Sequence, residues 1–253
     1  MNIFNNLNII FNEIKSAYQL RFQESLKMLN AFLIILGIRF IVMGLSNLFV
    51  DDGYSIQYIV FYFSTSLLMM GLEIGMIKFY FKFIDNKIKS QFEIFNYFYL
   101  LKKYFLGLLF FYLIIAISLI PGLTYLIIKT NYEILNIIQS SIDDIYFQQL
   151  ISSYFTPFDI IIITSLILIP LIYIMTRLCF WNYLLIDQNI SGLESINQSF
   201  KITQHRELEI MLYFGIFFIL NLIGILTIFG MLFTIPSTYL FFSKYSRLLR
   251  SQI

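Results

Sequence analysis

The sequence is short of the residues from which soluble proteins build their surfaces. Only 13% of its 253 residues are charged, whereas 59% are apolar, and the mean hydropathy is +0.79. An ordinary soluble domain carries about 25% charged residues, because polar side chains must cover most of its surface. This scarcity of charge excludes a soluble globular enzyme and a disordered chain, and it predicts an integral membrane protein.

Cysteine and histidine are almost absent. The chain has one of each, Cys179 and His205, so one chain can form neither a disulfide nor a zinc site of His and Cys ligands. It also cannot ligate haem through two histidines, and it has no glycine-rich phosphate loop and no Ser-His-Asp set. We therefore expect no enzymatic activity, no cofactor and no metal. The net charge of +2 is too small to predict nucleic-acid binding.

Long apolar runs predict an all-α, polytopic fold with six membrane-spanning helices in a single transmembrane domain, residues 1–253. A spanning helix needs about 20 mostly apolar residues. The spans we expect are about 29–49, 56–81, 104–128, 158–183, 210–229 and 231–247. The last two share one apolar stretch, in which we expect a tight turn near Gly230 and Pro236 in the first turn of the sixth helix. The alternative is a single long helix kinked at Pro236.

The positions of the basic residues favour six spans over five. With six spans and both termini inside, the inner segments are 1–28, 78–103, 184–209 and 244–253. They contain every Lys and Arg of the chain except Arg39, Arg177 and Lys129. Such an excess of positive charge is typical of the cytoplasmic side. Five spans would place the basic residues of the last segment outside.

Three inner segments have the pattern of amphipathic helices lying in the membrane interface. In each, apolar residues recur at helical spacing with polar residues between them. These segments cover about 3–26, 88–103 and 192–207. The outer segment Thr130 to Pro157 has a similar spacing, which predicts a short outer helix.

The last part of the chain resembles a known family. Residues 192–201, with the sequence GLESINQSFK, are followed by a long span and then by Gly230, Pro236 and Tyr245. This order is similar to that of a group of uncharacterised bacterial six-span inner-membrane proteins, which is similar to the membrane domain of glycerophosphoryl diester phosphodiesterases. The resemblance implies a multi-pass protein of the bacterial cytoplasmic membrane. It implies no catalytic residues, because that membrane domain is not the catalytic part.

Two charged residues inside the predicted spans are the main functional candidates. Arg39 and Glu73 each lie about nine or ten residues from the inner end of their span, roughly 14 Å deep at 1.5 Å per residue. An antiparallel hairpin would let them form an intramembrane ion pair. This pair would act either as a structural salt bridge or as part of an ion or proton relay. We favour the salt bridge, because no His lies in any predicted span and the one other acidic residue, Asp159, is at the outer end of the fourth.

Small residues in the first two spans predict close helix packing. Gly71 and Gly75 flank Glu73 on one face of the second span, and Gly37 and Gly44 offer a similar face on the first. Glycines at such spacing let another helix approach closely, from the same chain or from a partner.

Two further polar residues in the predicted spans are expected to have structural roles. Asn221, in the fifth span, should form an interhelical hydrogen bond. Arg177, near the inner end of the fourth span, should extend to the membrane interface, with pairing to Glu73 as the alternative.

Two functions are compatible with these features. The first is a non-catalytic accessory or scaffold subunit of a larger membrane complex, with the lipid bilayer and other membrane subunits as partners. The second is a small transporter or lipid-handling permease that uses Arg39 and Glu73.

Overall fold

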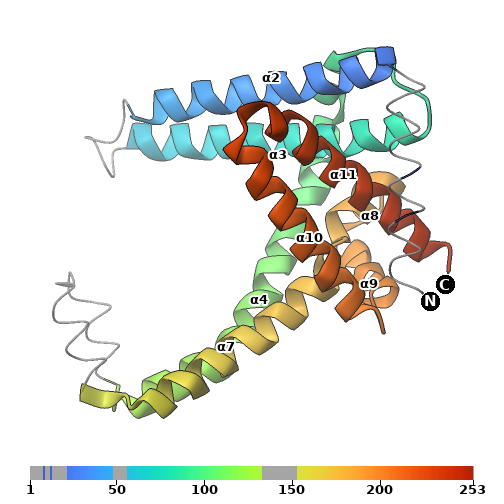
Figure 1. The fold of residues 1–253 in the computed structure, drawn as a ribbon. Coiled ribbons are helices and arrows are strands. Elements are labelled where there is room, and N and C mark those ends of the chain that lie inside the picture. The colour runs from blue at the N-terminus through green and yellow to red at the C-terminus, as the bar shows by residue number, and fades with distance from the viewer. Residues whose placement is uncertain (1–7, 9–11, 13–21, 48–55, 133–152, 253) are drawn as a thin grey trace. The chain divides into compact units, whose positions relative to one another are not determined.

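The computed structural model describes residues 8, 12, 22–47, 56–132 and 153–252, and every regular element in this part is helical (Figure 1). The elements are α2 (Phe22–Asn47), α3 (Ile56–Ile84), the 3₁₀ helix η2 (Gln91–Leu100), α4 (Leu101–Lys129), α7 (Pro157–Leu178), α8 (Trp181–Gln188), α9 (Gly192–Ile202), α10 (Glu207–Leu226) and α11 (Ile228–Arg250). The all-α prediction is confirmed for the described residues. The predicted outer helix, and most of the predicted segment 3–26, lie outside them.

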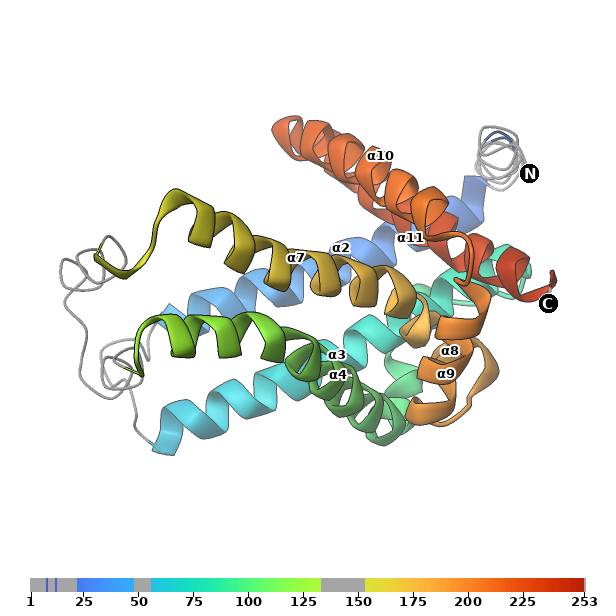
Figure 2. The same ribbon diagram turned by 90° about the horizontal axis from the view of Figure 1, so that it is seen from below.

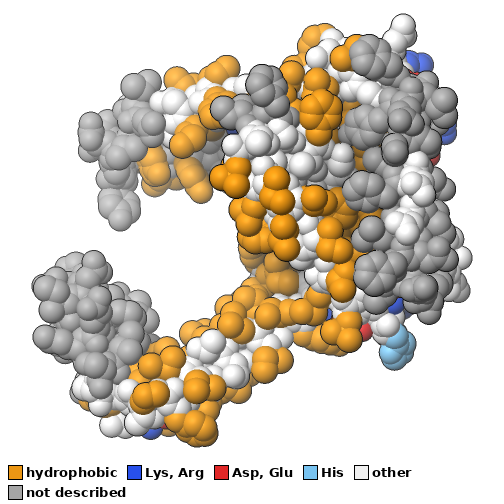
Figure 3. Space-filling model, viewed as in Figure 1, with side chains coloured by type: hydrophobic (Ala, Val, Ile, Leu, Met, Phe, Trp, Pro, Cys, Tyr) orange, Lys and Arg blue, Asp and Glu red, His pale blue; other side chains and the backbone are white. Residues whose placement is uncertain are grey.

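Five helical segments among the described residues are long and apolar enough to cross a membrane. They are Gln23–Ser46, Ile56–Ile84, Gln91–Lys129, Pro157–Gln188 and Glu207–Leu226. At most 28% of the residues in their most apolar windows are buried inside the protein, so their hydrophobic side chains face outward (orange in Figure 3). Water would not tolerate so much exposed apolar surface, whereas lipid does. The chain is a multi-pass helical membrane protein. The sixth predicted span corresponds to α11, which is not among the five, so a sixth crossing stays a prediction.

The contacts of the chain form two compact units, one of Met1–Leu108 with Phe180–Ile253 and one of Leu109–Cys179. In the second unit α4 packs on α7, where a Cβ at Gly122 would lie 2.4 Å from the Ile167 side chain. The Asp159 carboxylate accepts a hydrogen bond from the Tyr125 hydroxyl at 2.8 Å and pairs with Lys129 at 3.1 Å. These contacts hold the end of α4 to the start of α7.

The core of the first unit forms where α3 meets α2, η2 and α11. Fully buried side chains of this cluster include Met28, Leu72, Phe79 and Ile94. Glycines set the distance between α3 and η2, because a Cβ at Gly71 would lie 2.2 Å from the Phe98 ring and one at Gly75 would lie 1.9 Å from the Ile94 carbonyl oxygen. The residues that pack against this glycine face therefore come from the same chain.

The predicted amphipathic segments 88–103 and 192–207 correspond to η2 with the start of α4, and to α9. In η2 the Ser90 and Glu93 side chains form a capping box, and Glu93 also pairs with Lys82 of α3. In α9 the Ser195, Ile196 and Ser199 side chains are buried. In η2 the side chains of Ile94, Tyr97 and Leu100 are buried, whereas Phe92 and Tyr99 are exposed, as is Leu193 of α9. A position of these segments in the membrane interface stays a prediction.

The fourth predicted span, 158–183, contains a helix break. Helix α7 ends at Leu178 and α8 begins at Trp181. Between them the Phe180 N–H donates to the Ser199 hydroxyl at 3.3 Å. The Phe180 N–H thus bonds to α9 instead of bonding to a carbonyl of α7 and continuing that helix.

Helices α10 and α11 form an antiparallel hairpin (Figures 1 and 2). Successive contacts pair residues of increasing number on α10 with residues of decreasing number on α11, which defines the direction. These contacts are Phe214–Phe242 at 4.5 Å between ring centroids, Phe217–Phe241 at 4.6 Å and the hydrogen bond Asn221–Thr238 at 3.1 Å. Of the two predicted alternatives, the hairpin is correct and the single kinked helix is wrong.

The turn of this hairpin lies at Thr227, not near Gly230 as predicted. Thr227 has an extended backbone (φ −111°, ψ 101°), and its N–H and hydroxyl both donate to the Ile223 carbonyl at 3.3 Å. The bond from the N–H is the last helical hydrogen bond of α10, and the extended backbone of Thr227 ends the helix. The prediction for Pro236 was also wrong, because α11 begins at Ile228 and this proline lies inside the helix.

Charged side chains tie the ends of α3, α8 and α11 together. The Arg247 guanidinium donates to Asp85 and to Asp187, with shortest distances of 2.6 Å to each. Arg250 also pairs with Asp187, and the Lys78 ammonium donates to the Ile186 carbonyl at 2.9 Å. The network fixes how α11 lies against the other two helices.

Candidate functional site

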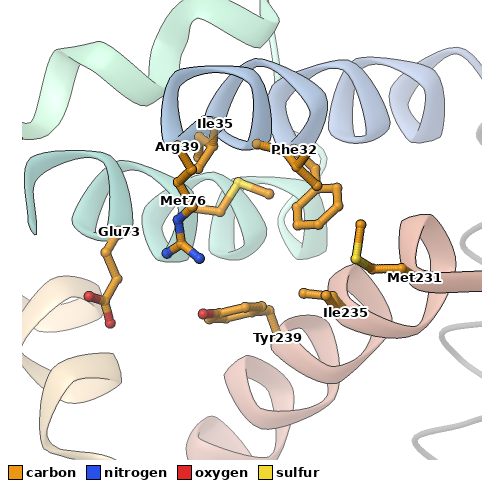
Figure 4. A pocket seen from close by; sticks show the side chains of 9 residues that line it. Phe32, Ile35, Arg39, Glu73, Met76, Met231, Ile235 and Tyr239 are labelled. Atoms are coloured by element: carbon orange, nitrogen blue, oxygen red, sulfur yellow. The ribbon is translucent and has the colours of Figure 1, made fainter. Parts of the chain in front are cut away.

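A pocket of about 160 Å³ lies between α2, α3 and α11 (Figure 4). Each helix contributes residues three or four positions apart, which lie on one helical face. The lining residues are Phe32, Ile35, Leu36 and Arg39 from α2, Glu73 and Met76 from α3, and Met231, Ile235 and Tyr239 from α11. The walls are therefore apolar, and the polar groups come from three residues.

Arg39 is an exposed residue of α2 whose guanidinium extends into this pocket (Figure 4). Its charge acts on both Glu73 and Tyr239. The Tyr239 ring is itself fixed, because it stacks on Tyr80 of α3 with centroids 5.5 Å apart and planes 9° apart. The pocket thus has a cationic side chain beside a fixed aromatic wall.

Glu73 is half-buried on α3, and Tyr104 of α4 is among the groups near its carboxylate. Tyr104 is 3% exposed, and its ring packs on Trp181 with centroids 5.0 Å apart. A fixed aromatic side chain therefore lies beside Glu73.

Arg39 and Glu73 come to the same pocket but make no direct ion pair. Both residues lie in the described part of the chain, and there no carboxylate oxygen is found within 4.0 Å of the Arg39 guanidinium. The arrangement differs from the predicted locking salt bridge: within the described residues the two side chains line one pocket but lie more than 4.0 Å apart.

The other residues singled out in the sequence lie away from this pocket. Asn221 joins α10 to Thr238 of α11, as the hairpin requires. Arg177 is 7% exposed, and its guanidinium lies 5.9 Å from the Tyr173 ring on α7. A Cβ at Gly37 or Gly44 would meet no atom within 4 Å among the described residues, so this face of α2 is open.

Sequence reasoning missed Tyr104, Tyr239 and Met231. Periodicity places a residue on a face of its own helix, but it does not say which other helix packs there. The one available signal was the spacing of Met231, Ile235 and Tyr239, which lie four residues apart and so share one face of a helix. That helix also carries charged residues.

The functional groups that line the pocket are one guanidinium, one carboxylate, one tyrosine hydroxyl and two thioethers. Within the described residues no group of three or more His, Cys, Asp or Glu side chains is placed to hold a metal ion.

Comparison of the chain with family models, with curated proteins and with solved structures found no match. The fold and the pocket therefore define the class, a multi-pass helical membrane protein with a charged pocket among its helices. The resemblance to six-span bacterial membrane proteins stays a prediction.

Proposed function

We propose that this protein is a small lipid-handling permease or carrier that binds the polar end of an amphiphile between α2, α3 and α11. The supporting observation is that Arg39 and Glu73 line one pocket without pairing to each other. Charged residues within membrane-spanning helices are costly and typically face a cavity or a substrate path. Helices α2 and α3 are both among the five apolar enough to span.

The size and lining of the pocket favour an amphiphile. Pockets for drug-sized molecules measure about 300–1,000 Å³, whereas this one has about 160 Å³. It has room for a headgroup rather than for a whole lipid. The apolar walls formed by Ile35, Leu36 and Met231 offer a surface along which acyl chains can leave the pocket.

The test is lipid retention by the purified protein. We expect the double variant Arg39→Gln/Glu73→Gln to bind added phospholipid at least about tenfold more weakly than the unmodified protein, because two charged contacts are lost. Native mass spectrometry of the delipidated protein measures this. The matched control is Lys102→Gln/Glu194→Gln, which changes two exposed charged residues away from the pocket. Equal lipid binding by both double variants and the unmodified protein would refute the proposal.

A second candidate is a non-catalytic accessory subunit of a larger membrane complex. The observation that favours it is the open face of α2 at Gly37 and Gly44, beside the exposed side chains of Phe40 and Met43. Small residues on such a face allow another spanning helix to pack closely.

This candidate is tested by mild detergent extraction and affinity purification from native membranes. We expect a stoichiometric partner subunit that is lost in Gly44→Leu and kept in Gly215→Leu. Gly215, on α10, is a suitable control because it also has open space around it. Purification of the unmodified chain as a lone monomer would argue against a complex.

We also propose that the membrane is the cytoplasmic membrane of a bacterium, with six crossings and both termini on the cytoplasmic side. The distribution of Lys and Arg supports this orientation.

A further inference from the structure

Two side chains of opposite charge line the pocket between α2, α3 and α11 without forming an ion pair. A cationic and an acidic side chain in a common cavity normally pair, because their attraction offsets the cost of removing them from water. Here Arg39 and Glu73 line the same cavity, and within the described chain no oxygen–nitrogen distance of 4.0 Å or less joins them. The space between them is the pocket itself (Figure 4).

The surrounding packing fixes the walls of this pocket. Tyr104, which lies near Glu73, is 3% exposed and packs on the Trp181 ring. The Tyr239 ring stacks on Tyr80 and so fixes α11 against α3 beside the two charged side chains. Preorganised charges of this kind favour a ligand that brings the complementary charges with it.

We propose that the pocket binds a zwitterionic phospholipid headgroup, with the phosphate on Arg39 and a primary ammonium on Glu73. This inference rests on the proposed lipid-handling function and specifies the lipid class. A guanidinium matches phosphate oxygens with two parallel hydrogen bonds, and a carboxylate accepts N–H bonds from an ammonium.

The two charges also select against other headgroups. A purely anionic headgroup would place a second negative charge near Glu73, and a purely cationic one would be repelled by Arg39. Unfavourable like-charge contacts of this kind are a common source of specificity.

The neighbouring surface favours a lipid over the free headgroup. Next to Arg39, the side chains of Phe40 and Ile41 are 65% and 64% exposed, as expected for a helix face in contact with acyl chains. A ligand already anchored in that layer arrives at a high local concentration, which a soluble headgroup lacks.

The experiment measures competition among headgroups on the delipidated protein in detergent. The probes are phosphatidylethanolamine, phosphatidylcholine and phosphatidylglycerol with identical acyl chains, and O-phosphoethanolamine as the headgroup without chains. We expect phosphatidylethanolamine to bind at least about tenfold tighter than phosphatidylglycerol, as one charge-assisted hydrogen bond would give. Phosphatidylcholine, whose ammonium has no N–H, should bind more weakly than phosphatidylethanolamine.

Variants separate the two halves of the site. Glu73→Gln should lose the preference for phosphatidylethanolamine over phosphatidylglycerol while still binding both. Arg39→Gln should weaken all three phospholipids. The control Glu194→Gln, an exposed carboxylate on α9, should leave the preference unchanged. If a pocket variant does not fold, the competition on the unmodified protein decides alone.

Several outcomes would overturn the inference. Equal affinity of the unmodified protein for phosphatidylethanolamine and phosphatidylglycerol would refute the zwitterionic headgroup but leave lipid handling intact. Binding of O-phosphoethanolamine as tight as that of the lipid would show that the ligand is the free headgroup. Binding of no phospholipid at all would refute both this inference and the proposed function.

Discussion

At the scale of single residues, small and charged side chains have the clearest consequences. The glycines of α3 and α2 have opposite surroundings although their sequence patterns are similar. Gly75 faces the backbone of η2, whereas Gly37 faces open space within the described structure. The difference depends on whether a second element packs there, and the glycine pattern alone does not specify that.

We predict that Gly75→Ala destabilises the protein by about 1–3 kcal/mol, because its Cβ would overlap the Ile94 carbonyl oxygen and force η2 away from α3. Gly37→Ala is the matched control and should be neutral or slightly stabilising, since alanine favours helix over glycine. Thermal unfolding in detergent measures both. Equal effects of the two substitutions would contradict the packing of η2 on α3.

A second prediction concerns pH. The hydrogen bonds from Arg247 lower the pKa of Asp85, which follows the end of α3, below its ordinary value of 3.8. A lowered pKa in the folded state means that the unfolded state binds the proton more readily. This contribution to stability is therefore complete well above pH 3.8 and is lost as the pH falls through the folded-state pKa.

Asp85→Asn should accordingly be less stable than the unmodified protein at pH 6, and the difference should shrink as the pH falls below about 4. Melting temperatures from pH 6 down to pH 3 measure it, with Glu194→Gln as a control outside the network. A constant difference across this range would show that the Asp85 charge does not contribute to stability.

At the scale of secondary structure, the α10–α11 hairpin shows what the sequence could and could not specify. The length of the apolar stretch predicted two helical segments. Asn221 was expected to form a hydrogen bond with another helix, and it does so with Thr238. The position of the turn could not be predicted from Gly230 and Pro236, because both residues are tolerated inside spanning helices. The break instead lies at Thr227, whose backbone is extended.

The hairpin gives a third prediction. Asn221→Ala and Thr238→Ala should each destabilise the protein, and the double variant should lose less than the sum of both. The coupling expected for one interhelical hydrogen bond among apolar helices is about 0.6 kcal/mol and at most about 1.7 kcal/mol. A double-mutant cycle by chemical or thermal unfolding measures it. Strict additivity would show that the two side chains do not interact.

At the scale of the whole molecule, the sequence predicted the class of protein and the two charged residues of the pocket. Few charges in a very apolar chain made Arg39 and Glu73 conspicuous. The third wall of the pocket could not be predicted, because Tyr239 reaches it through contacts between helices distant in sequence. The direct ion pair was expected from depth alone, and among the described residues the two side chains line one pocket without forming it.

The fourth prediction concerns topology. If α11 crosses the membrane as the sixth span, a reporter fused after residue 253 lies on the cytoplasmic side, because α10 and α11 then form a complete hairpin across the bilayer. Paired fusions of alkaline phosphatase and green fluorescent protein measure this, and we expect only the fluorescent fusion to be active. The same pair fused after Thr227 should give the opposite result. An active phosphatase fusion at residue 253 would mean that α11 does not cross.

The contribution of α11 to the pocket also has a consequence for biosynthesis. The end of α3 leaves the ribosome about 150 residues before Met231, which at about 5–20 residues per second corresponds to roughly 7–30 s. During that interval the newly inserted Arg39 and Glu73 have no third wall beside them, and water or lipid headgroups must solvate both charges. A nascent chain arrested before α11 would expose this polar surface to the insertion machinery and to membrane proteases. Only a chain that has inserted α11 would have the complete pocket. The exposed charges would then distinguish fragments from full-length molecules.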